Sequence, residues 1–195
     1  MIDKQKLKER RKKAYDKWIS KEENQKKHKN GIKERSQKSR QWLDTYKKDK
    51  KCEICGQSHI STLDFHHKNP NEKDGLVGDF VRSYSIKRLQ EEINKCQILC
   101  ANCHIKKQYN LEKEKNKKTS EAKRILGNKC IKCGEQNSLC LEFHHHNKLE
   151  KIDNISNMIN TNGWQTILKE LEKCELLCRN CHRVLHYNEK HGAVV

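Results

Sequence analysis

Apolar and polar residues alternate in two short segments of the chain, and each segment occurs twice. The first alternation spans Thr62–His67 and returns at Cys140–His145, and the second spans Cys96–Cys100 and returns at Cys174–Cys178. Successive side chains of a β-strand point to opposite faces, so alternation of this kind is typical of strands with one buried face. The pattern therefore predicts four short strands.

Helical spacing predicts further elements around these strands. A polar loop of about 18 residues follows the first strand of each pair, and a short amphipathic helix comes next, at about Ile86–Lys95 and Trp164–Lys173. Another helix is expected to begin at the cysteine pair that follows the second strand. The predicted order is therefore strand, loop, helix, strand and helix, repeated once.

The first 50 residues predict two charged helices. The first covers residues 3–28 and the second about Ile32–Lys48, and we expect a break between them at Asn30–Gly31. Trp42, Leu43 and Tyr46 form an apolar patch on the second helix, which is expected to dock on the first repeat.

A matching charged helix is predicted at Leu111–Leu126, before the second repeat. Ile125 and Leu126 would dock on that repeat, and Gly127–Asn128 would end the helix.

The two repeats align without a gap at an offset of 78 residues. Residues 52–110 and 130–188 share 20 identities over 59 positions. Each copy begins with C-x2-C, contains F-H-H, and ends with K-C-x3-C-x-N-C-H. The landmarks pair as Cys52 with Cys130, His66 with His144, His67 with His145, Cys100 with Cys178, and His104 with His182. A repeat of this length is one supersecondary unit used twice.

The formal net charge of +17 lies outside the repeats. Residues 1–50 contain 19 Lys or Arg and 8 Asp or Glu, and residues 105–129 contain 9 and 3, whereas 51–104 and 130–195 carry equal numbers of each sign. Basic arms beside neutral domains indicate a polyanionic partner. A solvated, lysine-rich helix is the alternative. The lysines proposed to contact nucleic acid are Lys12, Lys13, Lys26, Lys27, Lys47, Lys48, Lys117 and Lys118.

The eleven cysteines favour metal over disulfides. The charged N-terminus has no apolar signal region and no stretch of the chain is long enough to span a membrane, so we expect a soluble intracellular protein with reduced thiols. Two C-x2-C pairs about 45 residues apart suit a closed tetrahedral zinc site. The predicted structural ligands are Cys52, Cys55, Cys100 and Cys103 in one site, and Cys130, Cys133, Cys178 and Cys181 in the other. Units this small usually need metals, disulfides or partners to fold.

Two glycines lie next to the predicted zinc sites, and three cysteines lie outside them. Gly56 and Gly134 follow the first cysteine pairs, where a positive φ is often required. Cys96 and Cys174 are expected to be small buried apolar residues, and Cys140 has no equivalent in the first repeat.

The histidines of the second repeat suggest an open metal site. His182 and His186 lie four residues apart on one helical face, and His144 would add a third imidazole. Its neighbour His145 points to the other face of the strand and is free to act as a general base, a role that histidine often takes near neutral pH.

The F-H-H and K-C-x3-C-x-N-C-H motifs resemble those of the HNH (ββα-metal) endonuclease superfamily, in particular a branch stapled by four zinc-binding cysteines. The resemblance covers about 60% of the chain. It implies that His66 and His144 bind a catalytic divalent metal (Mg, Mn or Zn) with His104 and His182, that His186 is a further ligand, and that His67 and His145 activate water. The implied fold is small and α+β, with two tandem ββα-metal units.

Two positions depart from that family pattern. Gln108 stands where the second repeat has His186, and Lys95 and Lys173 replace the central Asn of the motif. His146 is expected to be solvent-exposed or to contact phosphate, and His28, His59 and His191 are expected to have no role in catalysis.

The expected function is hydrolysis of DNA phosphodiester bonds. The expected organisation is a leader (1–50), a first HNH repeat (51–110), a linker (111–129) and a second repeat (130–190). Two sites could form an internal pseudo-dimer that cuts one strand each without a homo-oligomer, or the second repeat alone could cut while the first binds. A non-catalytic zinc-ribbon protein that binds nucleic acid is the rival class, and RNA is not excluded as the substrate.

Overall fold

The computed structural model describes residues 4–109 and 117–192. Its elements form a small α+β protein with two separate two-stranded sheets, β1–β2 and β3–β4. The chain divides into two compact units. One combines the chain up to Tyr46 with His67–Cys96, and the other combines Lys47–His66 with the chain from Gln97 onward.

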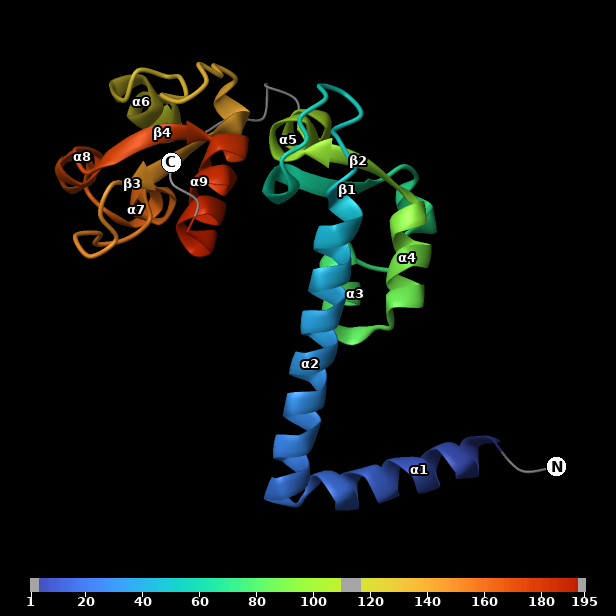
Figure 1. Cartoon of the computed structure of the whole chain (residues 1–195). Coiled ribbons are helices and arrows are strands. Elements are labelled where there is room, and N and C mark those ends of the chain that lie inside the picture. The colour runs from blue at the N-terminus through green and yellow to red at the C-terminus, as the bar shows by residue number, and fades with distance from the viewer. Residues whose placement is uncertain (1–3, 110–116, 193–195) are drawn as a thin grey trace. The chain divides into compact units, whose positions relative to one another are not determined.

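The leader forms two helices, α1 (Lys4–Ile19) and α2 (Glu22–Lys47), as Figure 1 shows. The predicted break at Asn30–Gly31 is wrong, because α2 continues through both residues. A single glycine costs a helix only about 1 kcal/mol, and strong helix formers flank this one. The chain turns instead at Ser20, whose hydroxyl donates to the carbonyl of Lys17 at 2.8 Å.

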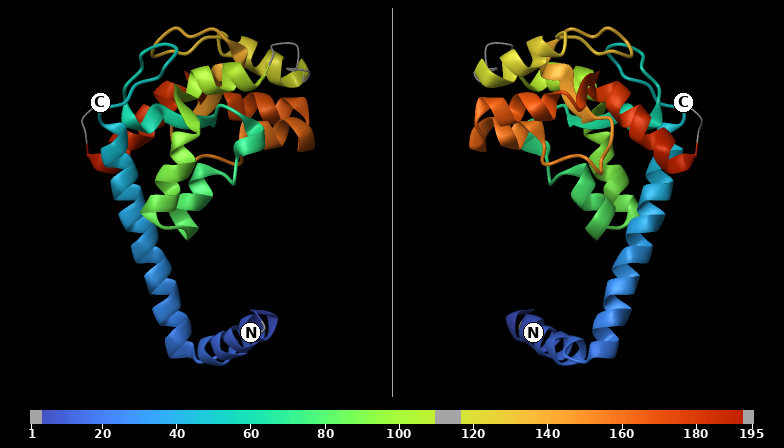
Figure 2. Two further views of the ribbon diagram at one scale, coloured as in Figure 1. Left: turned by 90° about the vertical axis from the view of Figure 1, so that its right-hand side faces the viewer. Right: turned by 90° about the vertical axis from the view of Figure 1, so that its left-hand side faces the viewer.

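Two short helices lie beside α2, in the views of both Figure 1 and Figure 2. They are α3 (Val77–Ser83) and α4 (Ile86–Asn94). The sequence predicted α4 within one residue, but it predicted a polar loop where α3 lies. The apolar side chains of α3 are spaced along one helical face, and Val77, Phe80 and Val81 are buried.

The four strands are found where the alternation predicted them, within one residue. They are β1 (Leu63–His67), β2 (Cys96–Cys100), β3 (Leu141–His145) and β4 (Cys174–Cys178). Strands β3 and β4 are antiparallel, with Phe143 opposite Leu176 and His145 opposite Cys174. Each second strand leads directly into a helix, α5 (Ala101–Gln108) or α9 (Arg179–His191).

Three helices cover the sheet of the second repeat: α6 (Lys117–Ile125), α7 (Ile155–Thr161) and α8 (Trp164–Leu171). Their core includes the fully buried Ala122, Met158 and Ile167. Helix α7, like α3, lies in a predicted loop. The part of the predicted linker helix before Lys117 lies outside the described residues. Its expected docking residue Leu126 packs on the core, whereas Ile125 is 45% exposed, and Ala122 occupies the buried place. As expected, the helix ends in a left-handed turn at Gly127 and Asn128.

The cysteine-bearing ends of α5 and α9 meet within the second unit. The backbone N–H of Asn102 donates to Oδ1 of Asn180 at 3.3 Å, and the N–H of Asn180 donates to Oδ1 of Asn102 at 3.2 Å. These residues are 78 positions apart, so the contact joins equivalent atoms of the two repeats. Reciprocal contacts of this kind are the signature of an isologous, two-fold interface.

Among the helices of residues 4–109 and 117–192, none has the length and apolar character needed to cross a bilayer.

Candidate metal and histidine sites

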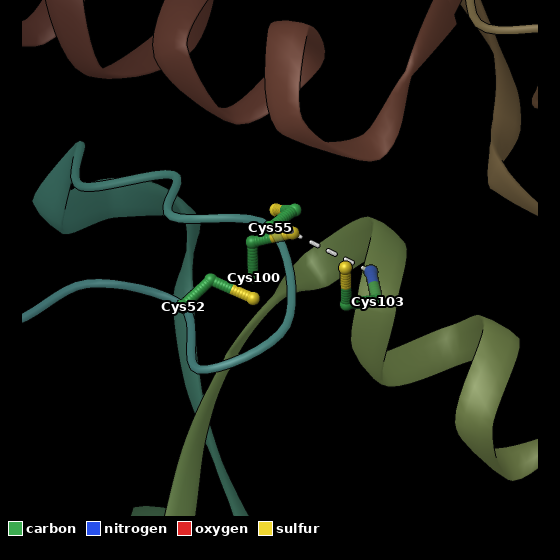
Figure 3. Close-up of side chains that lie close together, drawn as sticks. All are labelled: Cys52, Cys55, Cys100 and Cys103. Atoms are coloured by element: carbon green, nitrogen blue, oxygen red, sulfur yellow. Dashed lines mark hydrogen bonds between the residues drawn. The ribbon is translucent and has the colours of Figure 1, made fainter.

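Both predicted sets of four cysteines come together. Within each set the four sulfur atoms lie within 4.8 Å of one another. Figure 3 shows the first set, in which Cys52, Cys55, Cys100 and Cys103 converge between a loop and the start of α5. Cys55 and Cys100 place their sulfurs 3.6 Å apart. A tetrahedral zinc ion with bonds of about 2.3 Å separates its sulfur ligands by about 3.8 Å, so this set could hold one.

The second set repeats this geometry. Cys133 and Cys178 also place their sulfurs 3.6 Å apart. In both sets the first helical turn donates a backbone N–H to a ligand sulfur, from Cys103 to Cys100 and from Cys181 to Cys178. Gly56 and Gly134 adopt φ angles of 76° and 77°, which lets the loops turn back after each first pair.

The pKa values of the clustered thiols also favour binding of a divalent cation. Burial raises the pKa of Cys52, but backbone hydrogen bonds from the two loops outweigh burial and lower it to about 7. Burial and the neighbouring thiols together raise the pKa of Cys103 far above its ordinary value. The second set behaves in the same way, with the pKa of Cys130 lowered to about 7 and that of Cys133 raised by burial to about 11. A bound divalent cation removes this mutual repulsion.

The remaining cysteines are buried, as predicted. Cys96 and Cys174 each direct the thiol to a main-chain carbonyl one helical turn earlier, in Glu92 and Glu170. Cys140 is fully buried, and its thiol faces the carbonyl of Asn102.

Three histidines of the second repeat converge on one point. The ligand nitrogens of His144, His182 and His186 lie within 4.8 Å of one another. Nε2 of His182 and Nε2 of His186 are 3.0 Å apart. Burial, followed by the two neighbouring imidazoles, lowers the pKa of His144 to about 4, so this ring is neutral near pH 7. Neutral imidazoles at this spacing could bind a divalent cation.

Carboxylates hold two of these rings from behind, a feature that sequence reasoning missed. Nδ1 of His182 lies 2.9 Å from Oε2 of Glu142, and Nδ1 of His186 lies 2.9 Å from Oε2 of Glu189. A carboxylate at Nδ1 fixes the tautomer whose Nε2 carries a lone pair, which is the usual arrangement behind metal-binding histidines. The two Nε2 atoms that approach each other are therefore the ligand atoms.

His145 has a different partner on the other side of the strand. Its Nε2 lies 3.0 Å from Oε1 of Glu170, which is fully buried. Oε2 of Glu170 accepts from the ammonium of Lys173 at 2.7 Å, and Oε1 also accepts from the backbone N–H of Ile152. Burial of Glu170 opposes its ionisation, but these three donors lower its pKa. Glu170 is therefore an anion that fixes one edge of the His145 ring.

The first repeat contains the same buried His–Glu–Lys arrangement. Nε2 of His67 lies 2.7 Å from Oε1 of Glu92, whose other oxygen accepts from Lys95 at 2.8 Å. Burial opposes ionisation of Glu92, but its hydrogen bonds lower its pKa to about 2. Lys95 and Lys173, which occupy the place of the motif's central Asn, thus act on the carboxylates. The identical E-x2-K-C sequence in both repeats was the signal that could have identified Glu92 and Glu170.

The first repeat has two histidines where the second repeat has a cluster of three, and the spacing of these two matches that of their equivalents. The ring centroids of His66 and His104 are 5.1 Å apart, against 5.0 Å for His144 and His182. Asp64 lies behind His104, with Oδ2 3.2 Å from Nδ1. Gln108 stands where the second repeat has His186, so this pair lacks the third imidazole.

A cavity of about 620 Å³ opens beside the second histidine cluster. Its lining includes His145, His182, Glu142 and Arg179, together with Ile105 and Tyr109 of the first repeat. The cavity is large enough for a nucleotide-sized group, and both cationic and apolar side chains face it.

The other histidines occupy surface or structural positions. His146 is exposed and lies 3.5 Å from a carboxylate oxygen of Glu175. His59 caps a short turn through Nδ1, His28 contacts Tyr15, and His191 stacks on Tyr187.

Most of the proposed nucleic-acid lysines are exposed: Lys12, Lys13, Lys26, Lys27, Lys48, Lys117 and Lys118, whereas Lys47 is half-buried. Some of them also have partners within the protein: Lys26 and Lys27 pair with Glu22 and Glu23, Lys47 donates to the carbonyl of Leu63, and Lys118 donates to that of Ile159. Lys47 also lies over the ring of Phe65.

Comparison of the chain with protein-family models, curated proteins and solved structures found no match.

Proposed function

We propose that this protein is a metal-dependent endonuclease of the HNH type that hydrolyses DNA phosphodiester bonds. One observation carries the proposal: three converging imidazoles stand next to a fourth, His145, whose far edge is fixed by a buried carboxylate. A purely structural metal site needs no such neighbour. The motif resemblance and the basic arms point to the same chemistry.

His145 is the proposed general base. Oε1 of Glu170 accepts a hydrogen bond from Nε2–H of His145, which leaves Nδ1 as the nitrogen with a lone pair. This nitrogen would accept a proton from the attacking water as the water oxygen bonds to phosphorus and the bond from phosphorus to the 3′ oxygen breaks, and the departing 3′ oxygen would take up a proton from solvent. The buried anion of Glu170 would then stabilise the imidazolium that forms, in the way that a buried carboxylate assists histidine in other hydrolases.

The histidine cluster would position the phosphate. His144, His182 and His186 would hold a divalent metal, which would supply Lewis-acid stabilisation of the negative charge that develops on the phosphodiester oxygens. Glu142 and Glu189 keep the ligand nitrogens of His182 and His186 directed into the site. The four-cysteine sites, each holding a structural zinc, would fix the helices that carry these ligands.

The proposal has two forms, which differ in whether the first repeat also cuts DNA. In one form, two sites cut one strand each, and in the other the second repeat cuts while the first positions DNA. The missing third imidazole at Gln108 favours the second form. The matching His67–Glu92 pair favours the first.

Nicking of a supercoiled plasmid tests the proposal. The zinc-loaded protein is expected to nick the plasmid with Mg²⁺, Mn²⁺ or Zn²⁺, to lose this activity in chelator, and to lose at least 100-fold in rate in His145→Ala, because removal of a general base typically costs about 10²- to 10⁴-fold. His146→Ala is the matched control, since this neighbouring histidine is exposed.

The outcome also separates the alternatives. DNA binding without any metal-dependent cleavage would support a non-catalytic zinc-ribbon protein instead. Double-strand cleavage that survives His67→Ala but not His145→Ala would exclude the two-site form. Parallel reactions on RNA would test the choice of substrate.

A further inference from the structure

An arginine stands behind the carboxylate of each histidine site, but the two arginines come from different places. In the second repeat, Nη1 of Arg179 lies 3.1 Å from Oε1 of Glu142, the carboxylate that holds His182. In the first repeat, Nη1 of Arg183 lies 2.7 Å from Oδ1 of Asp64, the carboxylate that holds His104. Arg183 belongs to α9 of the second repeat.

The alignment of the repeats makes this difference informative. The first-repeat position equivalent to Arg179 is Ala101, which is buried and has no charge. The first repeat therefore has no arginine of its own at this place. The second-repeat residue Arg183 corresponds to Ile105, so neither arginine has a counterpart at the 78-residue offset.

The contact is built into the join between the repeats. The reciprocal Asn102–Asn180 hydrogen bonds bring the starts of α5 and α9 together. Lys106 of the first repeat also pairs with Glu135 of the second, at 2.7 Å. Arg183 follows Asn180 by three residues, which is nearly one helical turn, so the same join directs it towards the first repeat.

We propose that Arg183 is a positioning residue for the first repeat. From the second repeat it orients Asp64 and thereby His104, just as Arg179 orients Glu142 and thereby His182 within its own repeat. The guanidinium binds one carboxylate oxygen and leaves the other to accept Nδ1–H of the histidine. Nε2 of His104 is then the nitrogen that carries the lone pair. The first histidine site is thus complete only when the second repeat is docked.

This inference deepens the proposed function but is tested without DNA. The test is the ring nitrogen spectrum of the full chain, loaded with two equivalents of zinc and labelled with ¹⁵N in histidine. The ring nitrogen shifts report the tautomer of each imidazole. Arg183→Gln is expected to shift the His104 signals towards a mixture of tautomers and to leave those of His182 unchanged. Arg179→Gln is the matched control, with the opposite result expected.

Equal effects of Arg183→Gln on both histidines, or no effect on His104, would overturn the inference. If Arg183→Gln disturbs folding, as judged by the amide spectrum, Arg183→Lys and Asp64→Asn replace it. Arg183→Lys should retain the His104 tautomer, and Asp64→Asn should lose it. If each arginine variant alters only the histidine of its own site but the protein does not cleave plasmid, the nuclease proposal alone is refuted. If the protein cleaves plasmid but the two variants do not differ in this way, the role of Arg183 alone is refuted.

Discussion

At the scale of single residues, the main finding is that carboxylates determine what the histidines can do. Glu170, Glu142 and Glu189 each contact one nitrogen of a histidine in the second repeat. An imidazole with one nitrogen fixed by an anion presents its other nitrogen as a lone pair, either to a metal or to a proton. His182 and His186 are fixed at Nδ1, whereas His145 is fixed at Nε2, and this contrast distinguishes the proposed ligands from the proposed base.

Replacing Glu170 by Gln tests this distinction. The amide keeps the shape of the side chain but removes the negative charge that fixes the His145 tautomer and stabilises its protonated form. We expect the initial nicking rate to fall by about 10- to 100-fold, the usual effect of removing such a partner. Glu172→Gln, at an exposed position just after α8, is the control. Equal rates for the two variants would argue against a role for Glu170.

At the scale of elements, α3 and α7 are the helices that the sequence did not predict. Both lie in segments that look like polar loops, because each has only three buried apolar residues among exposed polar ones. Isolated helices this short are unstable in water. Helix α7 forms because Ile155, Met158 and Ile159 pack in a core built by residues distant in sequence, including Ala122 and Leu171.

Truncation of Met158 should therefore destabilise the protein. Met158 is 1% exposed, and removing a buried methionine side chain typically costs about 2–5 kcal/mol. We expect Met158→Ala to lower the free energy of unfolding of the zinc-loaded protein by that amount in urea titrations. Asn160→Ala, on the exposed face of the same helix, should change it by less than about 0.5 kcal/mol. If the two variants have equal stability, α7 does not contribute to the core.

At the scale of the whole molecule, the chain combines neutral metal-binding repeats with basic helices. Its stability and its proposed binding to polyanions are therefore expected to depend on different parts of the chain. Each repeat spans only 59 aligned positions, so metal bound at the four-cysteine clusters is expected to supply much of the folding free energy. The helices of the leader carry exposed charge and few buried residues.

The number of tightly bound zinc ions tests the role of the clusters. Native mass spectrometry is expected to find two zinc ions per chain in addition to any ion held by the histidine cluster, and Cys133→Ser should lower the number by one, because three thiolates bind zinc far more weakly than four. Cys140→Ala changes a buried cysteine that lies outside both clusters and should leave the number unchanged. Loss of zinc in both variants would contradict the assignment of the ligands.

The dependence of DNA binding on salt tests the role of the leader. Replacing Lys12 and Lys13 by Gln should weaken binding to any DNA sequence and reduce the slope of log K against log salt by about 2, because each phosphate contact contributes about 0.9. A Lys132→Gln, Lys169→Gln double variant removes the same charge from the second repeat. If it has an equal effect, net charge alone drives binding, and the leader makes no specific contribution.

The sequence by itself determined the local features. The 78-residue repeat, the eight clustered cysteines, the four strands and the left-handed glycines all follow from short-range patterns, because strand alternation and chelating spacing involve neighbouring residues. The His144, His182 and His186 grouping also followed from the helical i, i+4 spacing and the repeat. The continuous α2 helix was missed because propensity outweighs a single glycine.

Only the tertiary structure decided which acidic residues stand behind the histidines. Glu170 is 25 residues from His145, Glu142 is 40 from His182, and Asp64 is 119 from Arg183. No periodicity connects such positions, and acidic residues are common on protein surfaces. Burial and hydrogen bonding arise only when the strands pair and the two repeats dock, and these contacts assign each imidazole its tautomer and hence its proposed role.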